Sequence, residues 1–385
     1  KVLILAEYYP RASDPTLGVW AHRQAVAARD AGAEVRVLVL HRPLPTLADM
    51  RGLRVRPALD ALRQPASVAL DGIPVEYVRY VSPPRPLSYA SWGAWAAPSL
   101  HRALRRLRTR FAFSLAHAHY AVPAGDALRR AQPRTPLIVS VHGGDVHGPH
   151  AGTPAVARTL RHARLVLANS AGTARRCEQR GAARTRVVHL GTDVPVQPAT
   201  PPADPLLVTV GNLIGRKRHA DVLAALAILR RRHPRIRYSV VGDGPERAAL
   251  QAQAAAAGVA ELVTWHGRLD HTDAVAVARS GSLFVLPSVA EAFGVSYVEA
   301  MAAGVPAIGC RGEDGPEEIA AAGGGIELVA PRSPQALADT VDALLSDPAR
   351  MDRLRTAARE TVERGFTWRR CGAETVAAYE DVLHG

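Results

Sequence analysis

The sequence predicts an α/β protein made of two doubly wound, Rossmann-like domains. Short β-branched runs alternate with Ala-, Leu- and Arg-rich helical stretches along all 385 residues. A chain of this length is longer than a domain with a single hydrophobic core usually is, so two domains are expected. The segment Val194–Pro205 holds five prolines and no periodicity, which is typical of a linker. Continuous apolar strands separated by helices favour parallel sheets covered on both faces.

The first predicted domain covers residues 1–195, and its expected strands are short apolar runs followed by helical stretches: Val2–Glu7, Glu34–His41, Val75–Val81, Leu115–His119, Leu137–His142, Leu165–Asn169 and Val187–Leu190. The second covers residues 203–366, with expected strands at Leu206–Gly211, Tyr238–Gly242, Val263–Gly267, Leu283–Pro287, Pro306–Gly309 and Ile326–Val329. The last stretch, about residues 367–385, is expected to form an amphipathic helix that packs back on the first domain. We expect the two domains to face each other across a deep cleft between the carboxyl ends of their strands, where ligands of open α/β sheets bind.

Positive charge is concentrated in the first half of the chain. Residues 1–195 carry 28 Lys and Arg against 12 Asp and Glu, whereas the remainder carries 20 against 23. This asymmetry predicts that the first half meets something anionic, such as nucleic acid, an acidic membrane surface or a phosphorylated substrate. The alternative is an arginine-rich background composition without functional meaning.

The composition favours a cytoplasmic protein. No apolar run approaches the length of a membrane span, and Val2–Pro10 is too short for a secretory signal. Cys177, Cys310 and Cys371 lie far apart without metal-ligand spacing, which favours reduced structural thiols.

Two glycine turns follow neighbouring strands of the second predicted domain. Gly211 and Asn212 end the first of these strands, and Arg216 and Lys217 precede the next helix. The arginine guanidinium can bond to two phosphate oxygens and the lysine ammonium adds a further positive charge, so this turn is suited to bind a diphosphate. The alternative is a basic turn that is only solvated. The "GDGPER" turn one strand later repeats the design, although it is only a weak match to a dinucleotide fingerprint.

The stretch "SVAEAFGVSYVEAM" places two glutamates around the start of a helix near residues 293–294. The free amides of Phe293, Gly294 and Val295 are expected to face a phosphate. Glu291 in the loop and Glu299 in the helix suit the neutral hydroxyls of a ribose or a hexose. The alternative is that Glu291 only stabilises the helix dipole and that Glu299 is solvated.

Several motifs together resemble the family 4 glycosyltransferases. "EAFGVSYVEAMAAGVPAIG" resembles the E-x7-E signature of that family, "GNLIGRK" its G-N-x-x-x-x-K turn and "GDGPER" its G-x-G-P turn. "HGGDV" is similar to its His-Gly-x-Asp element, and "DPTLGVWAHRQAVAARDAGAEVRVL" to its first loop and helix. The order and spacing match over essentially the whole chain. The resemblance implies the GT-B fold and a retaining transfer of sugar from a nucleotide-diphosphate sugar to an acceptor hydroxyl.

The resemblance also implies a role for each matching residue. Arg216 and Lys217 would hold the diphosphate, while Glu299 would bind the ribose. His142, from the first domain, and Glu291 would approach the donor sugar. The expected catalytic residues are His142, Arg216, Lys217 and Glu291, and the expected donor-binding residues are Gly18, Asp145, Gly211, Asn212, Gly242, Gly244, Arg268, Phe293, Gly294, Val295 and Glu299.

The family suggests a metal-independent, front-side displacement in which the leaving phosphate takes the acceptor proton. The sequence holds no Asp-x-Asp motif, so we expect no metal and no other cofactor. Preplaced cations and amides would stabilise the charge of the leaving diphosphate, and no covalent role is expected for Glu291. Two departures from the family stand out. Gly18 is single where many relatives have two adjacent glycines, and Asp145 either binds donor or acceptor or caps the next turn.

A histidine pair in the first half has two interpretations. His117 and His119 lie on one face of a predicted strand, near His142 and Asp145 if the strand order is ordinary. These residues suit either a zinc site or a cleft wall that hydrogen-bonds to substrate, and the fold favours the cleft wall.

The segment 85–111 resembles an interfacial amphipathic helix. Five arginines at positions 102–110 lie near an apolar set formed by Trp92, Trp95, Leu100, Leu104 and Leu107. Such a segment would dock the enzyme peripherally on an acidic bilayer that carries lipid-linked acceptors. An ordinary helix with solvated arginines is the alternative.

Two other classes of protein remain as alternatives. A nucleic-acid-binding protein would explain the basic half, but the basic residues are not interleaved with stacking aromatics. A nicotinamide-dependent oxidoreductase would explain the glycine turns, but no GxGxxG follows the first strand. The expected partners are therefore a nucleotide-sugar donor and a glycan, lipid-linked or small-molecule acceptor, without nucleic acid.

Overall fold

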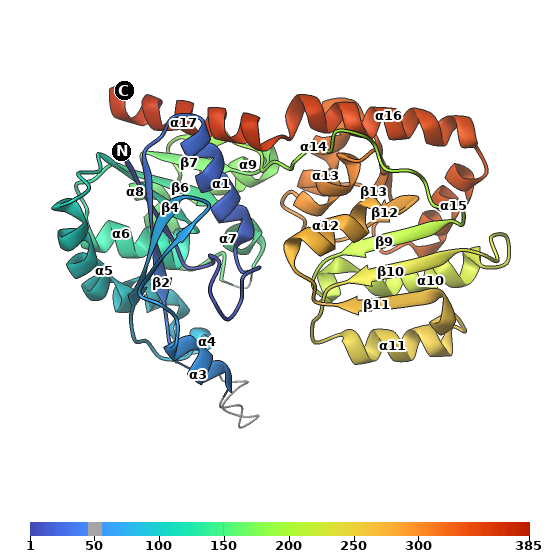
Figure 1. The fold of residues 1–385 in the computed structure, drawn as a ribbon, viewed down its shortest axis with the longest axis horizontal. Coiled ribbons are helices and arrows are strands. Elements are labelled where there is room, and N and C mark those ends of the chain that lie inside the picture. The colour runs from blue at the N-terminus through green and yellow to red at the C-terminus, as the bar shows by residue number, and fades with distance from the viewer. Residues whose placement is uncertain (45–55, 149) are drawn as a thin grey trace. The chain divides into compact units, whose positions relative to one another are not determined.

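The computed structural model describes residues 1–44, 56–148 and 150–385 (Figure 1). Contacts within the chain divide it into two compact units. Residues 1–190 and 368–385 form the first unit, and residues 191–367 form the second. Both units are α/β structures built on largely parallel sheets, which confirms the predicted fold class.

The sheet of the first unit has its topological switch point beside the first strand. The strand order is β3-β4-β2-β1-β5-β6-β7-β8, and only the β3–β4 pair is antiparallel. The strands are β1 (Val2–Ala6), β2 (Val35–His41), β3 (Ser67–Leu70), β4 (Ile73–Arg79), β5 (Leu115–His119), β6 (Leu137–Val141), β7 (Leu165–Ala168) and β8 (Thr185–Val187). The chain runs from β1 outward to the edge strand β3, returns to β4, and resumes with β5 on the other side of β1. Ligands of open α/β sheets bind at this kind of reversal.

Helices cover both faces of this sheet. They are α1 (Val19–Asp30), α3 (Arg56–Leu62), α4 (Arg85–Ser88), α5 (Trp92–Arg108), α6 (Asp126–Ala131), α7 (Gly143–His147), α8 (Pro154–His162), α9 (Ala171–Gln179) and α17 (Trp368–His384), with single turns η1 (Tyr89–Ser91) and η2 (Ala121–Gly125). Strand β1 is buried throughout because alternate residues serve two cores. Leu3 and Leu5 pack in the core that includes α5, whereas Val2 and Ile4 pack in the core that includes α1 and α17.

The C-terminal helix α17 lies against α1 in the first unit (Figure 1). Gly372 permits the close packing, because a Cβ there would lie 2.1 Å from the Ala27 carbonyl oxygen. The Gln24 side-chain amide also donates to the Thr375 hydroxyl at 3.0 Å.

The second unit repeats the same design with an all-parallel sheet. Its order is β11-β10-β9-β12-β13-β14, so the switch point lies between β9 and β12. The strands are β9 (Leu206–Val210), β10 (Arg237–Val241), β11 (Val263–Gly267), β12 (Leu283–Val285), β13 (Ala307–Cys310) and β14 (Ile326–Val329). The helices are α10 (His219–Leu229), α11 (Arg247–Ala256), α12 (His271–Arg279), α13 (Val295–Met301), α14 (Asp314–Gly323), α15 (Pro334–Leu345) and α16 (Pro348–Gly365), with single turns η3 (Gly215–Lys217) and η4 (Ala260–Leu262).

The proline-rich segment predicted as a linker belongs to the second unit. The Ala199 amide donates to the Ala303 carbonyl at 2.8 Å, and the Arg359 guanidinium donates to the Pro195 carbonyl at 2.8 Å. The segment therefore lies against the body of this unit although it contains no helix or strand.

Strand β3 is present in the structure but was absent from the sequence prediction. It pairs with β4 through a two-residue turn at Asp71 and Gly72, where φ is +46° and +78°. Asp-Gly with two positive φ angles is typical of a tight β-hairpin.

The apolar stripe of α5 faces the core of the first unit. Trp92, Leu100, Leu104 and Leu107 are almost fully buried there, whereas Trp95 is 48% exposed. Four of the five apolar residues predicted to meet a bilayer are therefore packed inside the protein. No helix within the described ranges is long and apolar enough to cross a membrane.

Candidate active site

Two loops meet at the switch point of the second sheet. The turn after β9 carries Arg216 and Lys217, and the loop after β12 carries Glu291. The Val289 amide donates to the Arg216 carbonyl at 2.8 Å, which joins the two loops through the backbone. The Lys217 ammonium lies 2.5 Å from Oε2 of Glu291, and the Ser288 hydroxyl donates to the same oxygen at 2.9 Å.

The Lys217–Glu291 ion pair is buried, whereas Arg216 remains accessible. Arg216 is 42% exposed at its side chain and its guanidinium lies 3.6 Å from Oε2 of Glu291. Burial alone would raise the pKa of Glu291, but Lys217 and Arg216 outweigh that effect and hold the pKa below its usual value. Glu291 is therefore ionised at neutral pH. The structure brings together three charged residues that the sequence had assigned to different parts of one ligand.

Helix α13 begins one or two residues later than predicted. Gly294 precedes it with φ +82°, and a Cβ there would lie 2.4 Å from the Tyr297 ring. Phe293 is buried and its ring packs against Phe366 at 5.7 Å between centroids. Helix α13 has seven residues, and a helix N-terminus carries only about half a positive charge, whereas Arg216 and Lys217 each carry a full one.

Glu299 projects from α13 into a buried environment. Burial raises its pKa to about 7, although Arg279 partly offsets this effect. The His271 imidazole lies 3.7 Å from the Glu299 carboxylate, at the start of α12. The predicted donor-binding residue Arg268 is exposed and lies three residues before His271, in the turn after β11. The sequence pattern did not indicate the burial that raises the pKa of Glu299.

The glycine turns after β9 and β10 pack against each other. Gly242 has φ +134°, and a Cβ there would lie 2.0 Å from the Gly211 carbonyl oxygen. A Cβ on Gly244 would lie 2.4 Å from the Leu213 carbonyl oxygen. At Gly211 itself a Cβ would meet only the Lys217 side chain, at the ordinary distance of 3.7 Å. The glycines at 242 and 244 are thus required by backbone contact, while Asn212 is exposed beside them.

Three histidines gather at the carboxyl ends of β5 and β6 in the first unit. His119 Nδ1 lies 3.2 Å from His142 Nε2. His117 bonds instead to the Ser140 hydroxyl and the Tyr379 hydroxyl, each at 2.8 Å. Burial lowers the pKa of His142 to about 4 and that of His117 to about 3, so both are neutral at pH 7. Among the described residues no group of three His, Cys, Asp or Glu is arranged to hold a metal ion.

Asp145 connects the two loops beside these histidines. Its Oδ1 accepts from the Ala121 amide at 3.2 Å, and its Oδ2 accepts from the His142 amide at 3.4 Å. Burial raises the pKa of Asp145 to about 7, and the amide hydrogen bonds partly oppose the shift. Both carboxylate oxygens are therefore occupied by backbone groups of the turns after β5 and β6.

Gly18 lies at the start of α1 with φ +65°. A Cβ there would lie 2.1 Å from the Tyr8 carbonyl oxygen, so the close approach that Gly18 permits is to the backbone of the loop after β1. The Tyr8 ring contacts the Tyr120 ring at 4.9 Å between centroids, and Tyr120 lies 4.8 Å from the His142 ring. Ring contacts therefore join the loops that follow β1, β5 and β6 at the switch point.

The chain matches known proteins along almost its whole length. Residues 17–196 match Glycosyltransferase Family 4, and residues 193–361 match the glycosyl transferases group 1. The glycogen synthase of Mycobacterium tuberculosis H37Rv is 30% identical over 283 residues, covering 68% of this chain and 67% of that protein. This chain belongs to the group 1, family 4 glycosyltransferases.

Solved structures agree with this assignment at the level of the fold. Sucrose-phosphate synthase from Thermosynechococcus elongatus superposes with a TM-score of 0.78 at 18% identity, covering 100% of this glycosyltransferase and 99% of that chain. Anabaena HepE in complex with UDP and glucose gives a TM-score of 0.73 at 19% identity, covering 99% of each. The protein is a nucleotide-sugar-dependent glycosyltransferase with the GT-B fold.

Sequence reasoning missed several residues that shape the site of this glycosyltransferase. Tyr120 directly follows β5 at the switch point, and its position alone could have indicated it. Ser288 and His271 contact the predicted glutamates from neighbouring turns. Glu313 bonds to the backbone of the Glu291 loop from the start of α14, and no motif indicated it.

Proposed function

We propose that this glycosyltransferase moves a sugar from a nucleotide-diphosphate donor to an acceptor hydroxyl with retention of configuration. The observation that carries the proposal is the buried Lys217–Glu291 pair with Arg216 beside it at the switch point of the second sheet. The turn after β9 thus supplies two cations that can bind a diphosphate, and the adjoining loop after β12 supplies an oriented carboxylate that can bind a sugar.

Lys217 and Arg216 stabilise the leaving diphosphate. Negative charge builds on that group as the glycosyl–phosphate bond breaks, and preplaced cations lower the energy of this state. The accessible guanidinium of Arg216 can fork onto two phosphate oxygens, while Lys217 supplies a fixed point charge. The amides of residues 293–295 make a smaller contribution. With two cations in this role, the reaction needs no metal ion or other cofactor.

Glu291 orients the donor sugar and does not attack it. The contacts of its carboxylate to Lys217, Arg216 and Ser288 all fall on Oε2, which leaves Oε1 for a sugar hydroxyl. A carboxylate held by two cations is a poor nucleophile, which supports front-side displacement. In that mechanism the acceptor oxygen bonds to the anomeric carbon on the face that the phosphate leaves. The departing phosphate oxygen takes the acceptor proton.

Glu299 of the second unit binds the ribose through its carboxylate. The imidazole of His142 is oriented by His119 and is neutral at pH 7 because burial lowers its pKa to about 4, so it adds no charge beside a ligand. The acceptor is a glycan, a lipid-linked glycan or a small molecule with a free hydroxyl, used in glycan, glycolipid or natural-product biosynthesis.

A thermal-shift screen with UDP, GDP, ADP and their sugar conjugates tests the assignment of roles. Lys217→Ala is expected to abolish stabilisation by the bare nucleoside diphosphate. Glu291→Ala is expected to spare that stabilisation and to remove the additional contribution of the sugar. If both variants lost only the sugar-dependent part, the assigned roles would be wrong.

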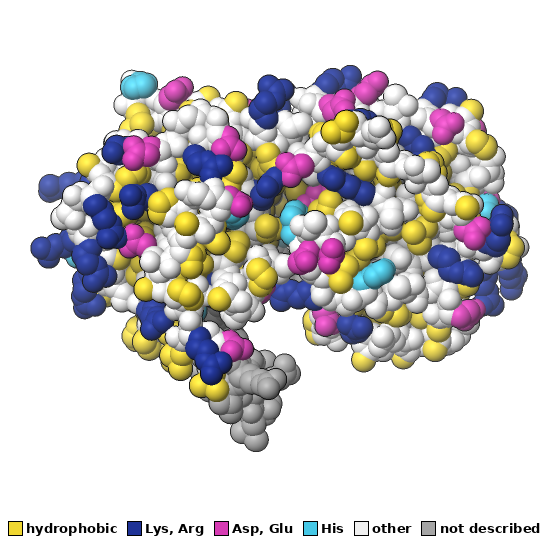
Figure 2. All heavy atoms as spheres, in the orientation of Figure 1, with side chains coloured by type: hydrophobic (Ala, Val, Ile, Leu, Met, Phe, Trp, Pro, Cys, Tyr) yellow, Lys and Arg dark blue, Asp and Glu magenta, His cyan; other side chains and the backbone are white. Residues whose placement is uncertain are grey.

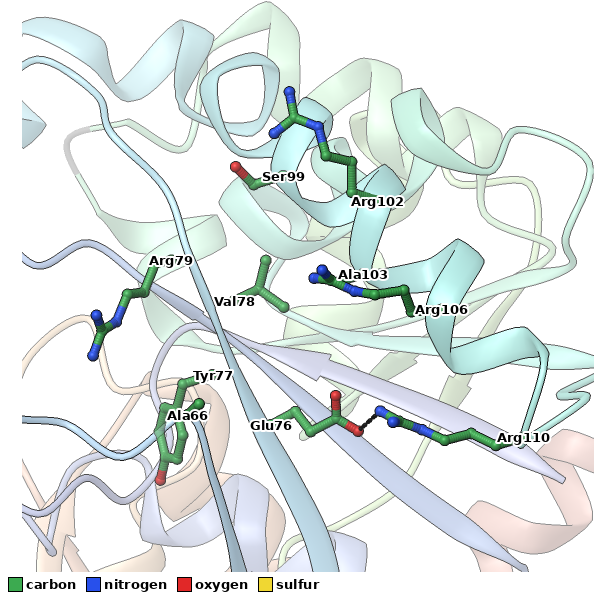
Figure 3. A pocket seen from close by; sticks show the side chains of 10 residues that line it. All are labelled: Ala66, Glu76, Tyr77, Val78, Arg79, Ser99, Arg102, Ala103, Arg106 and Arg110. Carbon is green, nitrogen blue, oxygen red and sulfur yellow. Dashed lines mark hydrogen bonds and ion pairs between the residues drawn. The ribbon is translucent and has the colours of Figure 1, made fainter.

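We further propose that the basic face of α5 docks the cytoplasmic enzyme peripherally on an anionic membrane. Figure 2 shows Lys and Arg side chains gathered over this part of the first unit. A groove of about 550 Å³ between α5 and β4 is lined by Arg102, Arg106 and Arg110 (Figure 3). Glu76, which also lines the groove, is already paired with Arg110 at 2.5 Å, so Arg102 and Arg106 are the arginines proposed to bind lipid phosphates.

Exposed apolar side chains near this face support the docking proposal. Leu87 is 77% exposed in α4 and Trp95 is 48% exposed in α5. Tryptophan and leucine beside arginines are typical of surfaces that lie in the bilayer interface. The core-facing stripe of α5 does not contribute to docking.

Flotation with vesicles that contain anionic phospholipid tests the docking surface. The double variant Arg102→Glu and Arg106→Glu is expected to lose flotation. The charge-matched control, Arg231→Glu and Arg353→Glu, changes exposed arginines of the second unit and is expected to float like the wild type. Equal loss in both variants, or no flotation of the wild type at low salt, would remove the proposal.

A further inference from the structure

The loop that carries Glu291 has an unusual backbone conformation. Ala290 has φ +56° and Gly294 has φ +82°, so two left-handed residues lie within five positions. An L-residue other than glycine adopts this region only when the surrounding structure holds it there. The loop therefore needs a contact that fixes Ala290.

Glu313 supplies that contact from the start of α14. Its Oε2 accepts a hydrogen bond from the Glu291 amide at 2.8 Å, and the Ala290 amide faces the same carboxylate. Consecutive amides around a left-handed residue form a concave anion-binding site. In this structure the anion in that site is the carboxylate of Glu313.

The position of Glu313 in its own helix strengthens this argument. It is the N-cap residue of α14, where a side chain ordinarily accepts from the first amides of the helix. The Glu313 side chain makes no such capping bond. It is directed instead to the neighbouring loop.

The backbone beside Glu313 lies against the same loop. The Gly315 amide donates to the Glu291 carbonyl at 3.3 Å, and a Cβ on Gly315 would lie 2.1 Å from the Phe293 carbonyl oxygen. The start of α14 thus contacts the backbone on both sides of the Glu291 side chain. The side chain is held separately by Lys217 and Ser288.

We infer that Glu313 is a positioning residue for the donor-sugar subsite, which it serves by fixing the Ala290–Glu291 backbone. The inference rests on the proposed role of Glu291 in binding the donor sugar. Without the Glu313 carboxylate, Ala290 would relax toward an ordinary backbone conformation. The Glu291 carboxylate would then lose its orientation toward the sugar, while Arg216, Lys217 and Glu299 would still bind the nucleotide.

The test compares Glu313→Ala and Glu313→Gln with Glu317→Gln. Glu317 is a matched control because its carboxylate accepts from the Gly312 amide at 2.8 Å, near the same helix start, and not from the amides of the Glu291 loop. The measurements are the dissociation constants of a nucleoside diphosphate and of its sugar conjugate, together with kcat. The sugar nucleotide used is the one that stabilises the wild type most.

Glu313→Ala is expected to change the affinity for the bare nucleoside diphosphate by less than about twofold. It is expected to remove the extra affinity given by the sugar and to lower kcat at least about tenfold. Glu313→Gln keeps one acceptor oxygen and is expected to lie between Ala and the wild type. If Glu313→Ala does not fold, Glu313→Gln carries the comparison alone. Glu317→Gln is expected to behave like the wild type.

A double variant, Glu291→Ala with Glu313→Ala, separates positioning from a general structural role. Once Glu291 is removed, loss of Glu313 should cost no further sugar affinity or kcat. Independent, additive losses would overturn the inference. So would tighter diphosphate binding by Glu313→Gln, since the carboxylate would then be competing with the ligand for the amides.

The same experiment distinguishes failure of this inference from failure of the proposed function. If Glu291→Ala alone leaves the sugar's contribution intact, the donor-sugar role of Glu291 is wrong. If Glu291→Ala removes that contribution but Glu313→Ala does not, only the positioning role of Glu313 is wrong.

Discussion

Replacement of Glu299 by glutamine is expected to remove a pH dependence from both stability and nucleotide binding. Glu299 is buried, and its pKa is raised to about 7. The charged groups around it are Arg279 and Asp193, with His271 at 3.7 Å from the carboxylate. Ribose hydroxyls bind more strongly to an ionised carboxylate than to a neutral one. Nucleotide binding should therefore tighten as the pH rises through about 7.

The size of the binding effect follows from the fraction of ionised Glu299. With a pKa of about 7, roughly a tenth of the protein carries the carboxylate at pH 6 and roughly nine tenths at pH 8. The wild type should therefore bind a nucleoside diphosphate about tenfold more tightly at pH 8 than at pH 6. Calorimetric titration at both pH values measures this ratio. Glu299→Gln corrects for the titration of the ligand itself.

The stability effect has the opposite direction. A group whose pKa is raised in the folded state stabilises the fold fully below its unfolded pKa, here 4.5, and this contribution is lost as the pH rises through about 7. The pKa shift of Glu299 corresponds to about 3 kcal/mol in the free energy of unfolding. The wild type should lose this stabilisation as the pH rises, whereas Glu299→Gln, which cannot ionise at this position, should not. Thermal unfolding without ligand, at several pH values, measures the stability of the wild type and of Glu299→Gln. Identical pH dependence of wild type and variant, in binding and in stability, would refute the reasoning.

Three further predictions concern the glycine turns and the buried ion pair. Gly242→Ala should destabilise the second unit by at least about 2 kcal/mol in thermal unfolding, because of its positive φ and the contact with the Gly211 carbonyl, whereas Gly211→Ala should be tolerated. Gly18→Ala should destabilise the first unit comparably, because its Cβ would collide with a carbonyl group; unchanged unfolding would contradict the φ argument. Glu291→Ala should leave the buried Lys217 without its carboxylate and cost about 3 kcal/mol; Lys217→Ala should cost less, because Arg216 still lies 3.6 Å from Glu291, and the double variant should cost clearly less than the sum. Additive losses would show that the pair is not coupled.

The sheets and their ends could be predicted because they depend on local pattern. Parallel strands such as Leu115–His119 are continuous apolar runs bounded by turn residues, and the structure has this strand with the same bounds. The hairpin strand Ser67–Leu70 was missed although Asp71–Gly72 carries a strong turn signal. Its residues alternate between exposed and half-buried, so the apolar run that reveals a central strand is absent.

The outward face of an amphipathic helix was harder to predict. Trp92 and Trp95 are three residues apart in the sequence, yet Trp92 is 1% exposed and Trp95 is 48% exposed. Periodicity shows that one face of α5 is apolar, but it cannot show whether a bilayer or the protein's own sheet covers that face. Only the packing of the first unit decides this.

Side-chain pairing within the site was also outside the reach of the sequence. The pattern placed Lys217 and Glu291 at strand ends but gave no reason for them to contact each other. The contact arises because β9 and β12 are neighbours at the switch point, although 72 residues separate the end of one from the start of the other. The same topology lets Glu313, which lies between β13 and α14, reach the loop after β12.

The buried pair of Lys217 and Glu291 is explained better by binding than by stability. A buried ion pair often contributes little net stability, because desolvation of both charges offsets their attraction. Two packed apolar side chains would serve the fold at least as well. Charges at this position instead keep a cation and a carboxylate fixed before the ligand arrives, so less reorganisation is needed when the diphosphate and sugar bind. The Ser288 hydroxyl and the Glu313 carboxylate extend this fixation to the side chain and the backbone of Glu291. The site is thus held rigid by contacts that exist without the donor.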